Sequence, residues 1–183
     1  MHRICFVVFI GVLLSGCGSP TGPSPASEPF LVMNQSGQLD QELDLFVDTD
    51  RQLRNWVSNL PDSLQAAYPA GQQWGFTGAV LRGSTALGSR PGRNLSGYKT
   101  LQLDVRGAVG GETVQIGIKD NTDPDDGTET RKTETLSANW QTFTYTLADF
   151  RTADLARVYL LFEVVFNGTG GRTVFLRNVR YVP

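Results

Sequence analysis

Hydrophobic and polar residues alternate along most of the chain after residue 30, and a period of two is typical of half-buried β-strands. No long stretch keeps a helical period. The alternation, together with frequent β-branched and aromatic residues, predicts strands at residues 42–47, 63–68, 74–82, 100–106, 113–119, 129–136, 141–147, 157–166 and 173–182. A short helical turn is expected over residues 51–57. Eight or nine strands at this spacing, separated by glycine-rich turns, indicate a β-sandwich.

The phase of the alternation assigns faces to these strands. In residues 101–106 and 113–119, leucine, isoleucine and valine fall on one face and polar residues fall mainly on the other. Residues 129–135 are polar on both faces, which predicts an edge strand or the lining of a wet groove. Residues 158–166 are apolar on both faces except for Glu163, so this strand is expected at the centre of its sheet.

The start of the chain follows the pattern of a bacterial lipoprotein signal. A basic beginning precedes an apolar run at residues 4–14, which is shorter than the roughly 20 residues that a membrane span needs. The run ends in the letters LSGC, so we expect a signal peptide over residues 1–16. Cys17 would then carry a diacylglyceryl thioether and an acyl chain such as palmitate. The alternative is an ordinary signal peptide with an incidental cysteine.

Proline and small polar residues dominate residues 17–29, a composition that cannot pack a core and predicts an extended spacer. One domain is then expected over residues 30–183. Gly18 follows the cysteine in place of an aspartate, which favours sorting to the outer membrane. The expected location is therefore the bacterial cell envelope, to which the exported protein would be held by its lipid.

Composition excludes several kinds of chemistry. The chain has 16 Lys and Arg, 18 Asp and Glu, one histidine and two cysteines, and it shows no positive excess typical of nucleic-acid binding. His2 and Cys5 would leave with the signal, so histidine-based triads, cysteine nucleophiles and zinc sites are not expected. Glu129, Glu134 and Glu163 form no paired glycosidase motif. We therefore expect no enzymatic activity and no required cofactor.

Short motifs mark the predicted strands in the last two-thirds of the chain. They are LSGYKTL at residues 95–101, GGETVQIG at 110–117, NWQTF at 139–143, LADF at 147–150 and FLRNVRY at 175–181. This set resembles carbohydrate-binding modules of the galactose-binding-like class, most closely those attached to glucanases, over residues 68–183. The resemblance implies an all-β jelly roll of two antiparallel sheets with little helix. It also implies non-catalytic binding of a poly- or oligosaccharide on the concave outer face of one sheet.

Sugar recognition uses an aromatic ring that stacks on C–H faces and planar polar groups that bind hydroxyls. The candidate carbohydrate-binding residues are Tyr68, Trp74, Gln115, Lys119, Arg131, Tyr159 and Glu163. Trp74 could lie in the core or in the groove, and Trp56 could be a buried residue or an exposed contact. Trp140 begins a strand in the family-like portion, which favours a structural role for it.

Among these candidates, Glu163 is the one whose position most strongly implies a partner of opposite charge. An ionised carboxylate in an otherwise apolar central strand costs several kcal/mol unless a cation pairs with it. Lys119 or Arg131 is the expected partner. The pair could be structural, beneath the surface, or it could face the ligand.

The residues also raise the question of a metal. The acidic segment 120–129 offers many oxygens, either to a hard cation or simply to solvent in a charged hairpin loop. The resemblance implies a structural calcium ion between the first and last strands, to which Asp44, Asp48 and Asn178 could contribute. Asn178 stands where relatives often place an aspartate, and its neutral amide lowers the charge of such a site.

The sequence therefore favours a membrane-anchored lipoprotein whose single jelly-roll domain binds a poly- or oligosaccharide. Its partners would be that glycan and, through the lipid, the membrane, but no nucleic acid. The alternative is an envelope scaffold or protein-interaction domain of the same fold, with a protein partner and no sugar site. An exposed aromatic beside polar groups on a concave sheet would favour the glycan, whereas a flat charged face with every tryptophan buried would favour the scaffold.

Overall fold

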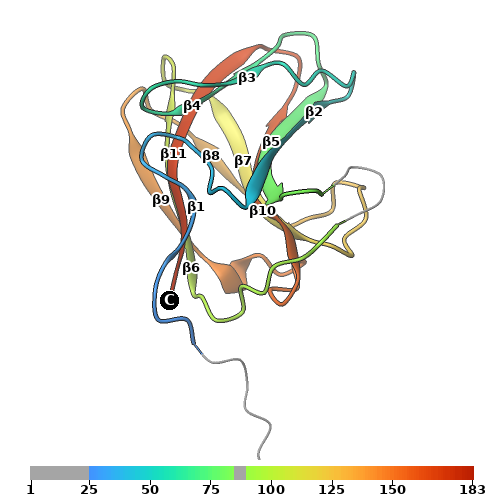
Figure 1. Cartoon of the computed structure of the whole chain (residues 1–183). Coiled ribbons are helices and arrows are strands. Elements are labelled where there is room, and N and C mark those ends of the chain that lie inside the picture. The colour runs from blue at the N-terminus through green and yellow to red at the C-terminus, as the bar shows by residue number, and fades with distance from the viewer. Residues whose placement is uncertain (1–24, 85–89) are drawn as a thin grey trace, which may run out of the picture.

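The computed structural model describes residues 25–84 and 90–183, which form two antiparallel sheets packed face to face (Figure 1). The six-stranded sheet contains β1 (Phe30–Met33), β3 (Val57–Asn59), β4 (Leu64–Tyr68), β6 (Thr100–Gly107), β9 (Gln141–Thr146) and β11 (Arg172–Val182). The five-stranded sheet contains β2 (Leu43–Thr49), β5 (Trp74–Leu81), β7 (Thr113–Asp120), β8 (Arg131–Thr135) and β10 (Val158–Asn167). The predicted all-β jelly-roll sandwich is confirmed.

Strand order shows which strands lie inside each sheet. The first sheet runs β3-β4-β11-β6-β9, with β1 paired to β11, and the second runs β2-β5-β10-β7-β8. β10 is therefore the central strand of its sheet and β8 lies at an edge, as the apolar and polar patterns predicted. β10 also carries two register shifts against β7. These bulges place the consecutive residues Tyr159 and Leu160 together in an outer hydrophobic cluster.

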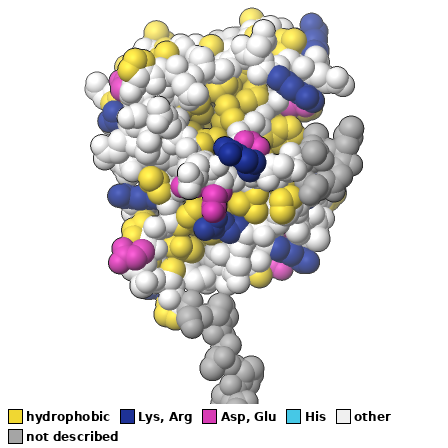
Figure 2. Space-filling view, viewed as in Figure 1, with side chains coloured by type: hydrophobic (Ala, Val, Ile, Leu, Met, Phe, Trp, Pro, Cys, Tyr) yellow, Lys and Arg dark blue, Asp and Glu magenta, His cyan; other side chains and the backbone are white. Residues whose placement is uncertain are grey.

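The core lies between the sheets and follows the predicted alternation. Leu101, Leu103 and Val105 of β6 are fully buried, and so are Ile116 and Ile118 of β7. Figure 2 shows hydrophobic side chains gathered in the hollow between β11 and the β2–β5 pair, with charged side chains around it. Burial of these apolar side chains between the two sheets supplies the main stabilisation of the sandwich.

The expected helical turn at residues 51–57 is wrong. Gln52 has a φ of 59°, which is outside the right-handed helical region. The backbone carbonyl of Trp56 accepts a hydrogen bond from Ala67, which holds the segment extended as it enters β3. Within the described residues, helix is limited to the 3-10 turn η1 (Leu147–Asp149). β1 and β3 were not predicted, because four and three residues are too few to show a period.

Among the described residues, no helix has the length and hydrophobicity needed to cross a membrane.

Candidate functional site

The outer face of the five-stranded sheet is hollowed by a cleft with a volume of about 630 Å³. The strand register explains its position, because residues that pair across neighbouring strands stand in rows on one face. One such row consists of Phe46, Gly78, Glu163, Gly117 and Arg131. Gly78 and Gly117 have no side chains, so the surface of the sheet is recessed at these two positions, between Phe46 at one end of the row and Arg131 at the other.

The glycines also leave room for particular neighbours. A Cβ atom on Gly117 would lie 2.8 Å from Glu163 Oε1, which is closer than real Cβ contacts, and 3.0 Å from Arg131 Cγ, which is tighter than most of them. A Cβ atom on Gly78 would lie 2.3 Å from the backbone carbonyl oxygen of Phe162 and 2.9 Å from a methyl carbon of Leu160. Gly117 thus permits the Glu163 carboxylate to meet Arg131 across β7, and Gly78 leaves room for the backbone of β10 and for Leu160.

Aromatic rings from β5 and β2 form one side of the cleft. Trp74 is 43% exposed, although it is the largest apolar side chain in the lining. Its ring is roughly parallel to that of Phe76, with the centroids 6.4 Å apart, and Phe46 meets Phe76 edge-on at 5.2 Å. Three neighbouring rings therefore offer a hydrophobic platform that is partly open to solvent.

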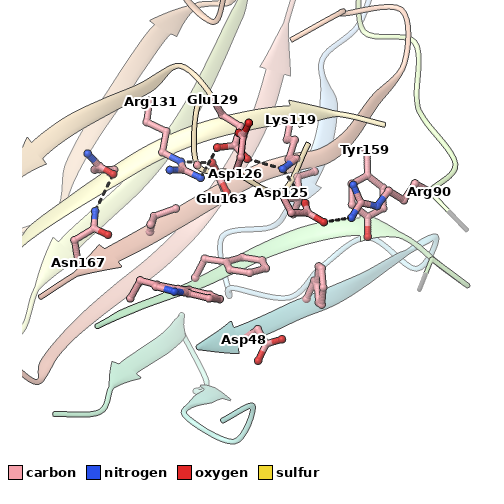
Figure 3. Close-up of a pocket in the computed structure, with 17 residues that line it drawn as sticks. Asp48, Arg90, Lys119, Asp125, Asp126, Glu129, Arg131, Tyr159, Glu163 and Asn167 are labelled. Carbon is pink, nitrogen blue, oxygen red and sulfur yellow. Dashed lines mark hydrogen bonds and ion pairs between the residues drawn. The ribbon is translucent and has the colours of Figure 1, made fainter. Parts of the chain in front are cut away.

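A row of alternating charges forms the other side, across the cleft from the rings (Figure 3). Arg131 donates to Glu163 at 2.7 Å and to Glu129 at 2.9 Å. Lys119 donates to Glu129 at 2.5 Å and to Asp125 at 2.9 Å, and Asp125 also pairs with Arg90. The row contains three cations and three carboxylates, so its charges balance.

Burial and pairing set the protonation of these groups. Burial raises the pKa of Glu163, and the adjacent Arg131 guanidinium opposes that rise. Burial also acts to lower the pKa of Lys119, but its hydrogen bonds to Glu129 and Asp125 outweigh this effect and leave that pKa raised. For Asp125, burial favours the neutral acid, yet hydrogen bonds from Lys119 and Arg90 hold its pKa below the usual range. Lys119 and Asp125 therefore remain charged at neutral pH.

The structure brings most of the predicted sugar-binding residues to this cleft. Its lining includes Trp74, Gln115, Lys119, Arg131, Tyr159 and Glu163. Arg131 is the direct partner of Glu163, and Lys119 reaches it only through Glu129. These paired side chains are mostly buried and also line the cleft.

Tyr68 does not lie with this group. It is 2% exposed, its ring stacks on Phe166 with the centroids 5.0 Å apart, and its hydroxyl donates to the carbonyl of Gly168. Leu64, Ala66 and Tyr68 share the inward face of β4, which directs the tyrosine to the core. Tyr68 is therefore not part of the cleft lining, whose aromatic rings come from β5 and β2.

The other tryptophans lie elsewhere. Trp56 is 7% exposed and packs edge-on against Tyr68 and Phe166 in the core. Trp140 is half-buried on the six-stranded sheet, where the guanidinium of Arg177 lies 4.1 Å from its ring centroid. Trp74 is therefore the tryptophan that a ligand in the cleft can reach.

Several lining residues were missed by sequence reasoning. They are Phe46, Asp48 as a cleft residue, Phe76, Arg90, Asp125 and Glu129. Alternation places Phe46 and Phe76 on the outer face, but an aromatic residue in a strand is usually assigned to the core. Glu129 and Asp125 could be identified only once Lys119 was known to lie beside their loop.

The residues proposed for a metal site, Asp44, Asp48 and Asn178, do not lie close together. Asp44 and Asp48 lie on β2 and pair with Arg82 at 3.5 Å and Arg54 at 3.3 Å. Asn178 lies on β11 in the other sheet and donates to Asp104. Over residues 25–84 and 90–183, no group of three or more His, Cys, Asp or Glu side chains could hold a metal ion.

The predicted lipidation site, Cys17, lies outside the described residues.

The acidic segment between β7 and β8 is occupied by protein contacts. Asp120 accepts hydrogen bonds from the backbone of Thr122, Asp123 and Asp154. These bonds hold the pKa of Asp120 low although burial acts in the opposite direction. Asp125 and Glu129 serve the ion-pair row instead. The segment thus shapes the cleft wall.

Several solved structures share this fold. A crystal structure of a family 30 carbohydrate binding module is 17% identical, covers 85% of this chain and 98% of its own, and gives a TM-score of 0.59. A second crystal structure of a family 30 module is 19% identical over 85% and 88% of the two chains, with a TM-score of 0.56. A mutant of CBM29-2 complexed with mannohexaose is 11% identical over 84% and 90%, with a TM-score of 0.54. No curated protein sequence matches the chain.

These likenesses show that the chain has the jelly-roll fold of the carbohydrate-binding modules. The family model for carbohydrate binding domain 30 matches residues 32–183, and the chain belongs to that family.

Proposed function

We propose that the cleft binds a segment of an uncharged polysaccharide or oligosaccharide without cleaving it. The observation that carries this proposal is the exposed ring of Trp74, which lies beside Phe76 and opposite a row of fixed polar groups. A sugar ring has an apolar C–H face and a rim of hydroxyls, and this cleft offers a complementary surface for each.

The charge balance of the row supports an uncharged ligand. Each charged group of the row is paired, so an acidic sugar would have to compete with Glu129, Asp125 or Glu163 for its cation. Hydroxyls can instead accept from the remaining N–H groups of Arg131, whose side chain is 18% exposed. A structural neighbour was solved with mannohexaose, which makes neutral hexasaccharides suitable probes.

The same pairing supports a non-catalytic role. Glycoside hydrolysis needs one carboxyl group to protonate the leaving oxygen and another to attack or to activate water. The side chains of Glu129 and Glu163 are only 4% and 3% exposed, and Arg131 binds both of them. We infer that these carboxylates hold the donor groups in place.

The competing role, an envelope scaffold without a sugar site, predicts a flat charged face with buried tryptophans. The open Trp74 ring inside a hollow favours the glycan instead.

We also propose that Cys17 carries the lipid and that the spacer holds the domain away from the outer membrane, where many anchored copies would raise a weak affinity by avidity. Mass spectrometry of the N-terminal peptide from cells would detect the diacylglyceryl cysteine, and a free or uncleaved Cys17 would overturn this part.

Calorimetric titration tests the binding proposal. The purified protein would be titrated with β-glucan, xylan and mannan hexasaccharides and with peptidoglycan fragments. We expect saturable binding of a neutral glycan and a loss of about tenfold or more in affinity for Trp74→Ala, equivalent to about 1.4 kcal/mol. Trp140→Phe is the matched control, because it alters a tryptophan away from the cleft. Failure of folded protein to bind any glycan, or equal binding by Trp74→Ala, would overturn the proposal.

A further inference from the structure

A second hollow with a volume of about 280 Å³ adjoins the cleft on the same face of the five-stranded sheet. The two share Gln115, Val165 and Asn167 in their linings, so they are parts of one groove. We propose that this second hollow is a subsite for the next sugar units of the bound chain. The inference rests on the proposed function, because it extends the same glycan beyond the cleft.

The register places the shared residues at the junction of the two hollows. Val165 pairs with Gln115, which pairs in turn with Thr133 at the edge strand β8. Asn167 pairs with Trp74, so the junction begins beside the aromatic platform. In Figure 3 Asn167 lies at one end of the labelled row and Arg90 lies at the other. A chain stacked on Trp74 would therefore meet the second hollow as it continues past Asn167.

The junction has the chemistry that a sugar needs. Val165 is 6% exposed and gives an apolar floor. The Asn167 amide donates to the Gln115 amide oxygen at 2.9 Å, which fixes the planes of both groups. One such bond uses a single donor and a single acceptor, and an amide pair has more of each. The remaining groups can bind neighbouring hydroxyls without reorganisation.

Arg172 closes the far side of the second hollow. Its guanidinium donates to three backbone carbonyls, those of Thr113 and Asn167 at 2.8 Å each and that of Gly170 at 3.4 Å. In the described chain no carboxylate lies within ion-pair distance of it, in contrast to the cations of the cleft. A guanidinium has five N–H groups, so donors remain for sugar hydroxyls. Its position is set by the backbone, which keeps those donors in place before a ligand arrives.

The proposal predicts a dependence of affinity on ligand length. Titration of the protein with a disaccharide, a trisaccharide and a hexasaccharide of the same glycan should show affinity rising beyond the length that fills the cleft alone. Arg172→Met removes the guanidinium and keeps the length of the side chain. It should weaken hexasaccharide binding by about three- to tenfold, as expected for one or two lost hydrogen bonds, and narrow the gap to the trisaccharide.

A second variant guards against misfolding of the first. Thr133→Leu removes a hydroxyl and fills part of the hollow from an exposed strand position. Thr144→Leu is its matched control, because Thr144 is an exposed threonine on β9 in the other sheet. Thr133→Leu should weaken the hexasaccharide more than the trisaccharide, and Thr144→Leu should change neither.

The outcomes separate the subsite from the proposed function. Trisaccharide binding that depends on Trp74, with no gain for the hexasaccharide and no effect of Arg172→Met or Thr133→Leu, would overturn the subsite alone. Absence of binding at every length in the folded protein would overturn both. A hexasaccharide gain that both variants reduce would establish the subsite.

Discussion

Replacing Arg131 by methionine tests how strongly the buried charges of the cleft depend on each other. The Glu163 side chain is 3% exposed and its Oε1 accepts a hydrogen bond from Arg131 at 2.7 Å. Glu129 would keep Lys119 as a partner in the variant, but Glu163 would be left as an uncompensated buried carboxylate. Breaking a buried ion pair in this way costs about 3–5 kcal/mol. We expect Arg131→Met to lower the free energy of unfolding by about that amount at pH 8.

The loss should depend on pH, with a definite sign. Burial already raises the pKa of Glu163, and Arg131 opposes this effect, so its removal raises that pKa further. A carboxyl with a raised pKa binds its proton more tightly in the folded state. The penalty is therefore absent below the ordinary carboxyl pKa of about 4.3 and grows as pH rises through the folded pKa, by at most about 1.4 kcal/mol per pH unit.

Urea unfolding followed by tryptophan fluorescence would measure this. Wild type and Arg131→Met are compared at pH 5, 6, 7 and 8, so that carboxyl groups common to both proteins cancel in the difference. The difference should shrink toward pH 5. The double variant Arg131→Met/Glu163→Met removes both charges and should recover much of the lost stability. A difference that is the same at pH 5 and pH 8, or below about 1 kcal/mol at pH 8, would refute the reasoning.

Two further variants separate the core from the cleft. Tyr68→Ala should lower the free energy of unfolding by about 3–5 kcal/mol, because it leaves a void beside Phe166, while glycan affinity at a temperature where the variant is folded stays unchanged. Weakened binding without a loss of stability in urea would contradict the placement of Tyr68 in the core. Gly117→Ala should cost about 1–3 kcal/mol, because its Cβ would press on Glu163 and Arg131, and it should also weaken glycan binding. Thermal unfolding and calorimetry measure the two effects, and an unchanged melting temperature would show that the ion pair can move aside.

Local pattern was enough to predict most of the strands and their inward faces. A period of two is visible within a single segment, and residues 101–105 show it without any knowledge of their neighbours. The edge position of β8 and the central position of β10 also followed from local polarity. The direction of Tyr68 was available from the same pattern, since Gln65 marks the outer face of β4.

The cleft itself could be predicted only in part, because it depends on non-local pairing. A carboxylate in an apolar strand requires a paired cation, so the sequence indicated that Glu163 pairs with either Lys119 or Arg131. The choice of Arg131 followed only from the register that sets Glu163, Gly117 and Arg131 side by side. The outward ring of Phe76 was missed because strand β5 is apolar on both faces, and that of Phe46 on β2 because an aromatic residue in a strand is usually assigned to the core. The residues proposed for a metal lie apart because β2 and β11 belong to different sheets.

The row of charges that forms one wall of the cleft has a consequence for the thermodynamics of capture. Arg131, Lys119 and Arg90 tie β8, β7 and two loops together through shared carboxylates. The entropy of ordering these long side chains is therefore lost when the chain folds, and little of it remains to be lost when a ligand enters. If the cleft binds a glycan as proposed, this preorganisation leaves the main entropic penalty with the sugar chain, so a stiff glycan would bind more tightly than a flexible one with the same hydroxyls.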